Sequence, residues 1–281
     1  MSAYGTIHRA PRTSYLPSTI WPWPEPASHL DSSQLQGPNL TLSDPIQRNV
    51  QISTISIHHV DEDAVIQAHE GLFEYLHSVF VNEVDKGTTY PQEDIHDPTI
   101  FASYFFAADV IIAIAGTGDE DAMLEIMTEV VDEPGTTVKE VGVSLDEARR
   151  GRSWEECVIG FYYVKPNYPG RSSHICNAGF VVPESQRGHG YGRVLAKSYL
   201  YYAPRLGYQA SVFNLVYVNN QASIRLWDKL GFTKAGLIPK AGRLKRLDGN
   251  GEEYVDAWVY YKSFVDHSEG TKGDGQDAIT L

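Results

Sequence analysis

A glycine-rich turn, RGHGYG at residues 187–192, is the feature of this 281-residue chain with the clearest chemical use. An apolar stretch ends at Val182 just before it, and a segment with helical spacing of apolar residues follows it. Glycines let the backbone approach a ligand closely, and the free N–H groups at the start of a helix favour phosphate. The turn therefore predicts a site for a phosphate-bearing ligand, and the alternative is a tight turn that binds nothing.

The surroundings of the turn exclude two common nucleotide sites. A Walker phosphate loop requires a Gly-Lys-Ser/Thr sequence, which does not follow here. A dinucleotide site needs an acidic residue about 20 positions further on, and residues 207–212 contain none. Arg187 and Arg193 flank the glycines as candidates for phosphate contacts, unless they are solvated surface arginines.

Two asparagines stand in segments that otherwise have the composition of buried strands. Asn177 lies in HICNAGFVV and Asn214 in ASVFNLVYV. Because a buried amide needs a hydrogen-bond partner, two of them on neighbouring strands predict a polar pocket. The alternative is a pair of structural amides. Asn220 precedes the next predicted helix and suits an N-cap.

Other catalytic patterns are not found. No Ser-His-Asp or Cys-His-Asn order is convincing, and no zinc or EF-hand spacing occurs, so no metal is expected. Cys157 and Cys176 are expected to be packing residues of a reduced protein.

The charges are divided unevenly along the chain. The net charge is −13, which argues against a nucleic-acid partner. Residues 156–264 nevertheless hold 14 Lys and Arg against 7 Asp and Glu, whereas residues 119–147 hold ten acidic residues and one lysine. The basic half suits a phosphate-bearing ligand, although two differently solvated surfaces would also explain the pattern. No apolar run is long enough to cross a membrane, so no membrane partner is expected.

Strand-like and helix-like segments alternate in the second half of the chain, which predicts an α/β fold. Residues 1–48 are rich in Pro, Ser and Thr and predict a flexible arm, docked by Trp21 and Trp23. Residues 49–265 are expected to form the folded domain with an acidic insertion at about 117–153, which contains a surface helix near 121–131. Residues 266–281 are expected to be a polar tail. The predicted strands are 50–57, 109–116, 156–166, 174–182, 210–218 and 253–261; the predicted helices are 61–86, 99–106, 190–206 and 219–230, and a Gly- and Lys-rich loop follows the last helix.

The glycine turn is followed, in order, by the sequence NQAS at residues 220–223 and by a helix that ends in Gly231-Phe232. With both motifs in this order and spacing, residues 158–261 resemble the GNAT (GCN5-related) N-acetyltransferase superfamily. The resemblance implies a mixed, twisted sheet with splayed strands, flanked by helices. It also implies acetyl-CoA as the cosubstrate.

A narrower resemblance is carried by KPNYPGRSSHICNAGF, GYQASVFNLVYVNNQAS and LIPKAG, together with TYPQ at residues 89–92. These segments are similar to the fungal N-acetyltransferases that detoxify proline analogues such as azetidine-2-carboxylate. The resemblance implies an enzyme that moves an acetyl group from acetyl-CoA to the ring nitrogen of a small imino acid, in detoxification or stress protection.

The same resemblance implies roles for particular residues. Asn177 would bind the carboxylate of the substrate, and Asn214 would lie beside the reacting nitrogen as the catalytic residue. The pantetheine arm would pair with the strand before the turn and contact the helix after it, while the turn would hold the pyrophosphate. The implied cofactor-binding residues are Phe180, Val182, Arg187, Gly188, His189, Gly190, Tyr191, Gly192, Arg193 and Asn220.

The proton route is less defined than the binding sites. No Glu or Asp stands in the strand where many superfamily members keep a base, and His174 is the nearest titratable side chain. A water relayed by backbone carbonyls and asparagines is the expected route. Many members use a Tyr as the acid toward the leaving thiolate, but Trp227 stands at that position here.

Two other functions stay open on these residues. A protein acetyltransferase would act on lysine or N-terminal amines, with the acidic insertion attracting basic tails. A non-catalytic acyl-CoA-binding module would explain why the expected Tyr and Glu are missing. Superfamily members commonly dimerise, so a homodimer is a further alternative. A cytoplasmic location is expected, and a mitochondrial one stays open because Arg9 and Arg12 lie in a stretch without acidic residues.

Overall fold

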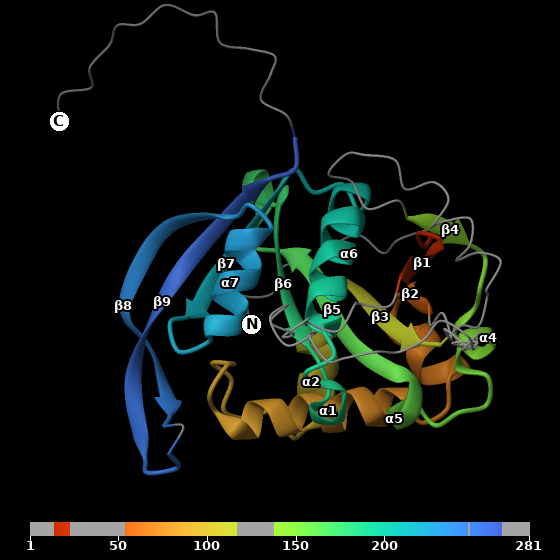
Figure 1. Ribbon diagram of the computed structural model, residues 1–281, viewed down its shortest axis with the longest axis horizontal. Coiled ribbons are helices and arrows are strands. Elements are labelled where there is room, and N and C mark those ends of the chain that lie inside the picture. The colour runs from red at the N-terminus through yellow and green to blue at the C-terminus, as the bar shows by residue number, and fades with distance from the viewer. Residues whose placement is uncertain (1–13, 23–53, 117–137, 247, 266–281) are drawn as a thin grey trace, which may run out of the picture.

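The computed structural model describes residues 14–22, 54–116, 138–246 and 248–265. Within them, nine strands form one sheet in the order β4-β1-β2-β3-β5-β6-β7-β9-β8 (Figure 1). All neighbours are antiparallel except β6 and β7, which are parallel. The strands are β1 (Ser18–Pro22), β2 (Thr54–Val60), β3 (Asp109–Ala115), β4 (Lys139–Val141), β5 (Val158–Pro166), β6 (Ile175–Val181), β7 (Ala210–Tyr217), β8 (Thr233–Lys245) and β9 (Glu252–Ser263).

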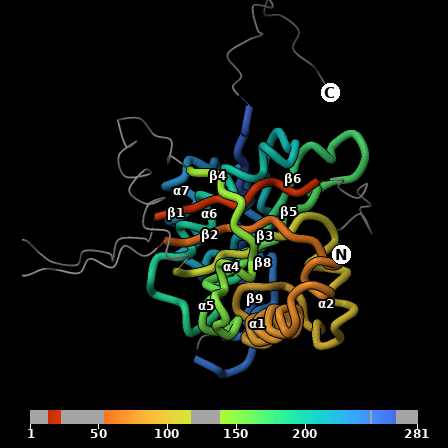
Figure 2. The backbone as a smooth tube through the Cα atoms, turned by 90° about the vertical axis from the view of Figure 1, so that its right-hand side faces the viewer, coloured from red at the N-terminus to blue at the C-terminus, as the bar shows by residue number. Residues whose placement is uncertain are grey.

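Helices cover both faces of the sheet. One hydrophobic cluster joins α6 and α7 to one face, and a second joins α1, α2, α4 and α5 to the other. Figure 2 shows α1, α2 and α5 together on one side of strands β1 to β3. No described helix is both long and apolar enough to cross a membrane. The helices are α1 (Leu72–Lys86), α2 (Pro98–Phe105), α4 (Leu145–Arg149), α5 (Trp154–Cys157), α6 (Tyr191–Arg205) and α7 (Gln221–Lys229).

The central strands are apolar on both faces because both faces are covered. Every residue of β3 is buried, and β5 is buried from Val158 to Val164. An unbroken apolar run is typical of such strands, and the strand predicted at 109–116 is confirmed. The fold is the predicted α/β arrangement of a mixed sheet flanked by helices. Cys157 and Cys176 are buried, and neither forms a disulfide within the described residues, as expected of packing residues.

Strands β6 and β7 are paired only at their first residues. The ladder contains Ile175 opposite Ala210 and Cys176 opposite Ser211, and no further pair. Beyond these residues β6 and β7 diverge (Figure 1), whereas β7 stays paired along its other edge with β9. The splayed strands predicted for this fold are therefore present, with one edge of β6 open toward β7.

The arm and the acidic insertion both contribute to the sheet, which corrects two expectations. Residues 18–22 form strand β1, and Trp21 is buried, so docking by Trp21 is confirmed but a flexible arm is wrong for this stretch. Residues 139–141 of the insertion form strand β4, which extends the sheet by pairing with β1. Trp23 and the helix predicted near 121–131 lie outside the described residues.

Three local predictions are also wrong. The predicted helix at 61–86 is interrupted, because a π-helix at Ala64–Ala68 ends before Gly71, whose left-handed conformation begins α1. Glu156 and Cys157 belong to α5, which a capping box at Ser153 starts, rather than to the following strand. The predicted Gly- and Lys-rich loop is instead the edge strand β8. Its exposed residues show no alternating pattern, and its hydrogen-bonded ladder to β9 holds it in place.

Candidate active site

The glycine turn leads directly into α6, as predicted. Gly190 is the N-cap of that helix with φ 81° and ψ 4°, and Gly188 has φ 83°. Both angles lie in the left-handed region, where a side chain is disfavoured. A Cβ added at Gly188 or Gly192 would meet no atom within 4 Å, so the turn faces open space. No side chain caps the helix, which leaves its first N–H groups directed at the surface.

The side chains of the turn lie in different environments. Tyr191, the first residue of α6, is buried in the core, and its ring stacks against that of His189 at 5.6 Å between centroids. His189 is exposed, and its Nδ1 lies 3.3 Å from the carbonyl oxygen of Gln186. Arg193 is exposed on the first turn of α6. The turn therefore offers backbone N–H groups with a cationic side chain beside them.

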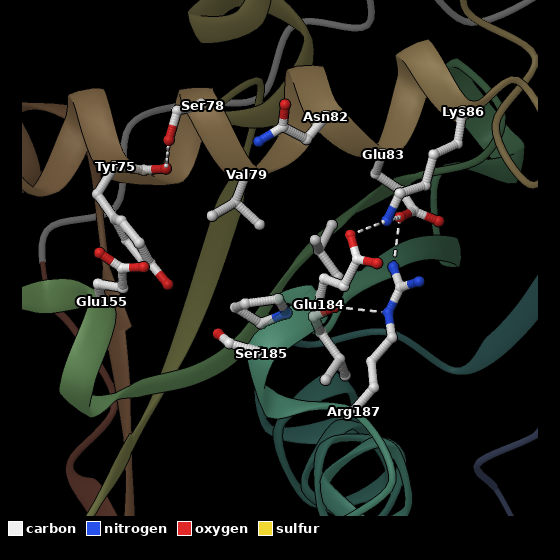
Figure 3. Close-up of a pocket in the computed structure, with 13 residues that line it drawn as sticks. Tyr75, Ser78, Val79, Asn82, Glu83, Lys86, Glu155, Glu184, Ser185 and Arg187 are labelled. Atoms are coloured by element: carbon white, nitrogen blue, oxygen red, sulfur yellow. Dashed lines mark hydrogen bonds and ion pairs between the residues drawn. The ribbon is translucent and has the colours of Figure 1, made fainter.

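Arg187 is directed away from the glycines, toward α1. It forms an ion pair with Glu83, and its Nε donates to the carbonyl oxygen of Val182 at 3.2 Å. Figure 3 shows Arg187 reaching toward Glu83 across a pocket of about 370 Å³ between α1 and the start of the turn. In this arrangement Arg187 anchors the turn to α1, which the sequence alone did not predict.

Glu83 connects α1 to the segment that follows it. Its carboxylate also accepts a hydrogen bond from Thr89 Oγ1 at 2.7 Å and lies 3.7 Å from Lys86 Nζ. Only 8% of Glu83 is exposed, on the buried stripe of α1 that contains Phe80. A carboxylate on an apolar stripe was the signal in the sequence that could have identified it.

The open edge of β6 carries the carbonyl groups of Phe180 and Val182. Gln209 N–H donates to the carbonyl of His174, at the β7 side, whereas Asn167 N–H donates to the carbonyl of Ile175, at the β5 side. Because carbonyl directions alternate along a strand, even-numbered carbonyls of β6 face β7.

The segment after α1 reaches this edge through Tyr90. The Tyr90 hydroxyl donates to the carbonyl of Phe180 at 3.1 Å, and Asn219 Nδ2 donates to the carbonyl of Thr88 at 3.3 Å. Residues 88–90 therefore contact both β6 and the segment that follows β7. Burial raises the pKa of Tyr90 well above its usual value, which keeps its hydroxyl protonated.

The surroundings of Trp227 do not suit the tyrosine that was expected at this position. Its ring is buried on the α6 face and contacts three other rings, from Phe180, Phe213 and Phe232. A tyrosine hydroxyl there would need a polar partner in an aromatic cluster. Asn220 is the N-cap of α7, and its Oδ1 accepts from Ser223 N–H at 3.1 Å, as predicted.

Asn177 and Asn214 are joined by a third amide, Asn167. Asn177 Nδ2 donates to Asn167 Oδ1 at 2.7 Å, and Asn214 Nδ2 donates to the same oxygen at 2.6 Å. Asn167 Nδ2 in turn donates to Asn214 Oδ1 at 3.1 Å. Asn177 Oδ1 is buried without a partner among the described residues. The two predicted asparagines are thus held together, with one acceptor atom still unsatisfied.

Asn167 was missed because its surroundings read as a turn. It follows Pro166 at the end of β5 and precedes a Tyr-Pro-Gly sequence, yet only 4% of it is exposed. Asn214 lies at a β-bulge, where the register between β7 and β9 shifts between Phe213 and Val216. A bulge redirects side chains locally, and here it accompanies an amide at the divergence of β6 and β7.

His174 is not part of this amide cluster. It is exposed, and its Nδ1 lies 3.2 Å from the carbonyl of Arg171 in the preceding turn. In the part of the chain that the structure describes, no group of three His, Cys, Asp or Glu side chains could hold a metal ion.

Comparison with known proteins agrees with this geometry. Residues 69–232 match the family model described as acetyltransferase (GNAT) family. The chain is 37% identical over 214 residues to N-acetyltransferase aca1 of Schizosaccharomyces pombe, covering 76% of this chain and 90% of that protein. It is 30% identical over 206 residues to protein SPT10 of Saccharomyces cerevisiae, covering 69% of this chain but only 32% of that protein.

Solved structures share the fold at low sequence identity. The Salmonella typhimurium protein yncA, a putative acetyltransferase determined with acetyl-CoA, has a TM-score of 0.51 and 16% identity, over 78% of this chain and 99% of that one. A GCN5-related N-acetyltransferase from Kribbella flavida has a TM-score of 0.50 and 21% identity, over 74% of this chain and 97% of that one.

The splayed sheet and the glycine turn before α6 define an N-acetyltransferase that uses acetyl-CoA as its cosubstrate. The chain belongs to the GNAT acetyltransferase family.

Proposed function

We propose that this enzyme acetylates the ring nitrogen of a small imino acid such as azetidine-2-carboxylate. The observation that carries the proposal is the cluster of Asn167, Asn177 and Asn214 beside the open edge of β6. Three amides held by one another form a rigid polar surface that suits a small molecule with several hydrogen-bonding groups. The identity with N-acetyltransferase aca1 over most of its length supports N-acetylation as the reaction.

The cofactor would lie along β6 and across the start of α6. The start of α6 has no side-chain cap and open space around Gly188 and Gly192, so the helix dipole would favour the pyrophosphate there. The backbone of Phe180 and Val182 would pair with the pantetheine arm, because these groups face the side where β7 has diverged. Asn220, at the start of α7, would contact the same arm.

Acetyl-CoA supplies an acetyl thioester, and the neutral ring nitrogen of the acceptor attacks its carbonyl carbon. Asn214 would orient that nitrogen, and Asn177 would donate its second N–H group to the carboxylate of the substrate, since its first N–H donates to Asn167. The proton lost by the nitrogen would leave through water held by backbone carbonyls and the asparagines. Trp227 cannot return a proton to sulfur, and a thiolate, whose thiol has a pKa near that of cysteine, leaves without strong assistance.

The proposal is tested by measuring thiol release from acetyl-CoA with a panel of amines. The panel contains azetidine-2-carboxylate, proline, a lysine peptide and a peptide with a free N-terminus. We expect the highest kcat/KM with azetidine-2-carboxylate. Faster turnover of either peptide would instead indicate a protein acetyltransferase, and acetyl-CoA binding without turnover of any amine would indicate a binding module.

A further inference from the structure

Lys165 is a half-buried cation near the amide cluster that the proposed chemistry does not yet use. It is the second-to-last residue of β5, and its Nζ donates to the carbonyl of Tyr104 at 2.9 Å. The same Nζ lies 3.8 Å from the ring centre of Tyr104 and 4.1 Å from that of Tyr163. One hydrogen bond and two aromatic rings therefore surround a group with three N–H donors.

The environment of this lysine lacks a negative charge. Among the described residues, no carboxylate forms an ion pair with Lys165. Burial alone lowers the pKa of Lys165 to about 7, since no charged neighbour offsets the loss of water. Lysines are almost never fully buried unless they are paired, and Lys165 is half-buried without an ion pair among the described residues. A carboxylate from a bound molecule would complete the environment.

The position of Lys165 points to the acceptor site. In the β5–β6 register Lys165 lies directly opposite Asn177, and Tyr163 lies opposite Gly179. Residues opposite each other in antiparallel strands share a face of the sheet and lie within side-chain reach. A Cβ at Gly179 would be 2.6 Å from the Tyr163 ring, so that ring lies over Gly179. The lysine is thus placed on the Asn177 side of the cluster.

The amides alone are a poor site for an anion. Asn177 already donates one of its two N–H groups to Asn167, and its oxygen is an acceptor. It can therefore offer a carboxylate at most one neutral hydrogen bond. A hydrogen bond from a charged donor is about twice as strong as a neutral one.

We propose that Lys165 binds the carboxylate of the acceptor and thereby selects amino and imino acids over amines that lack an acid group. This inference rests on the proposed function. It assigns the carboxylate end of the acceptor to Lys165 and Asn177, and the nitrogen end to Asn214. Lys165 is then a specificity-determining residue rather than a general base.

The proposal predicts a pH dependence specific to the acid substrate. The titratable groups facing Lys165 are Tyr104 from α2 and Tyr163 from its own strand, with Tyr90 next to them. Burial raises the pKa of all three, so they stay neutral around pH 7. As pH rises through about 7, the free enzyme loses the Lys165 cation. The KM for the acid should therefore rise in this pH range. The KM for its methyl ester should not show this rise.

The test compares azetidine-2-carboxylate with its methyl ester on wild type, Lys165→Met and Lys165→Arg. In Lys165→Met, we expect kcat/KM for the acid to fall roughly 10- to 150-fold, corresponding to a charge-assisted hydrogen bond of about 1.5–3 kcal/mol. The ester should change less than about threefold, and the pH dependence of the acid KM should disappear. Lys165→Arg should recover part of the preference for the acid, because it restores a charge.

A matched control is Lys234→Met. Lys234 also lies over aromatic rings, those of Trp258 and Tyr260, but it is paired with Asp228 at 3.1 Å. Its removal should leave the ratio of acid to ester unchanged. Acetyl-CoA affinity and melting temperature show whether each variant is folded.

The outcomes separate the two proposals. If wild type acetylates both compounds and Lys165→Met loses both equally, the carboxylate role of Lys165 is overturned while the proposed function stands. If wild type acetylates the ester better than the acid, the selection for a carboxylate is likewise overturned. If wild type acetylates neither compound, the proposed function fails, and the role of Lys165 fails with it.

Discussion

Asn177 on β6 and Asn214 on β7 donate hydrogen bonds to one and the same oxygen atom, Oδ1 of Asn167. The two strands are paired only at Ile175 and Cys176, so the amides meet where the strands have begun to diverge. This one oxygen atom therefore connects the two sides of the proposed substrate site. Its loss should disorganise both sides at once.

Replacement of Asn167 by Ala tests this connection. Asn177 and Asn214 lose the oxygen to which both donate, and Asn214 Oδ1 loses the hydrogen bond from Asn167. The KM for the amine substrate should therefore rise roughly tenfold or more. The acetyl-CoA Kd should change little, because the turn at residues 188–192 is made by other residues. Steady-state kinetics and calorimetric titration measure the two quantities. Asn250→Ala, in the exposed turn between β8 and β9, is the control, and an equal effect there would contradict the role of Asn167.

Replacement of Gly190 by Val should weaken acetyl-CoA binding strongly. Gly190 has φ 81°, and a β-branched side chain at the N-cap of α6 would both strain the backbone and occupy the path of the pyrophosphate. Gly207→Val is the matched control, because Gly207 has φ 92° at the other end of α6. Both variants should lose stability, but only Gly190→Val should raise the acetyl-CoA Kd. Equal affinities in the two folded variants would remove the turn from the cofactor site.

The ion pair between Arg187 and Glu83 should stabilise the turn against α1. Arg187→Ala leaves a nearly buried carboxylate with Lys86 at 3.7 Å and Thr89 as its remaining partners. We expect a loss of about 1–3 kcal/mol in the free energy of unfolding. The double variant Glu83→Gln/Arg187→Ala should recover part of it, because the unpaired charge is gone. Urea denaturation measures this coupling, and strictly additive losses would mean that the pair contributes nothing.

Lys165 should make the stability of the fold depend on pH above neutrality. Burial lowers its pKa to about 7 in the folded protein, against an ordinary lysine value of 10.5. Between these values the unfolded chain binds more protons than the folded one, so stability should rise with pH. At pH 7 this shift corresponds to a cost on the order of 4 kcal/mol for the charged form.

Lys165→Met removes the titrating group, so the variant can be compared with wild type to measure its effect on the free energy of unfolding. Urea denaturation at pH 7 and at pH 9.5 should show Lys165→Met as the more stable protein at pH 7, by a margin that narrows at pH 9.5. Lys234→Met should show no such narrowing, since Lys234 is partly exposed and paired. A constant difference between wild type and Lys165→Met would contradict the lowered pKa.

Much of the fold could be predicted because local patterns decide it. A strand buried on both faces, such as β3, is an unbroken apolar run in any context. Helix α6 is predicted by the glycines before it and by the helical spacing of apolar residues within it. The turn and Asn177, Asn214 and Asn220 could be proposed for the same reason, since each breaks a local pattern or begins one.

Other features depend on partners that are distant in the chain. Strand β8 has an exposed sequence without alternation, and only its backbone bonds to β9 make it a strand. Strands β1 and β4 likewise exist as a pair at the edge of the sheet, although more than a hundred residues separate them. Backbone hydrogen bonding is available to nearly any residue, so composition does not record it.

The sequence by itself determined where the glycine turn lies and that two amides stand in neighbouring apolar strands. Only the tertiary structure decided that Asn167 joins those amides, that Glu83 holds Arg187, and that the Lys165 ammonium lies against two tyrosine rings. The physical reason is that burial and charge pairing are properties of a position in space. A lysine near the end of an apolar strand could be solvated or enclosed, and packing of α2 against β5 encloses this one.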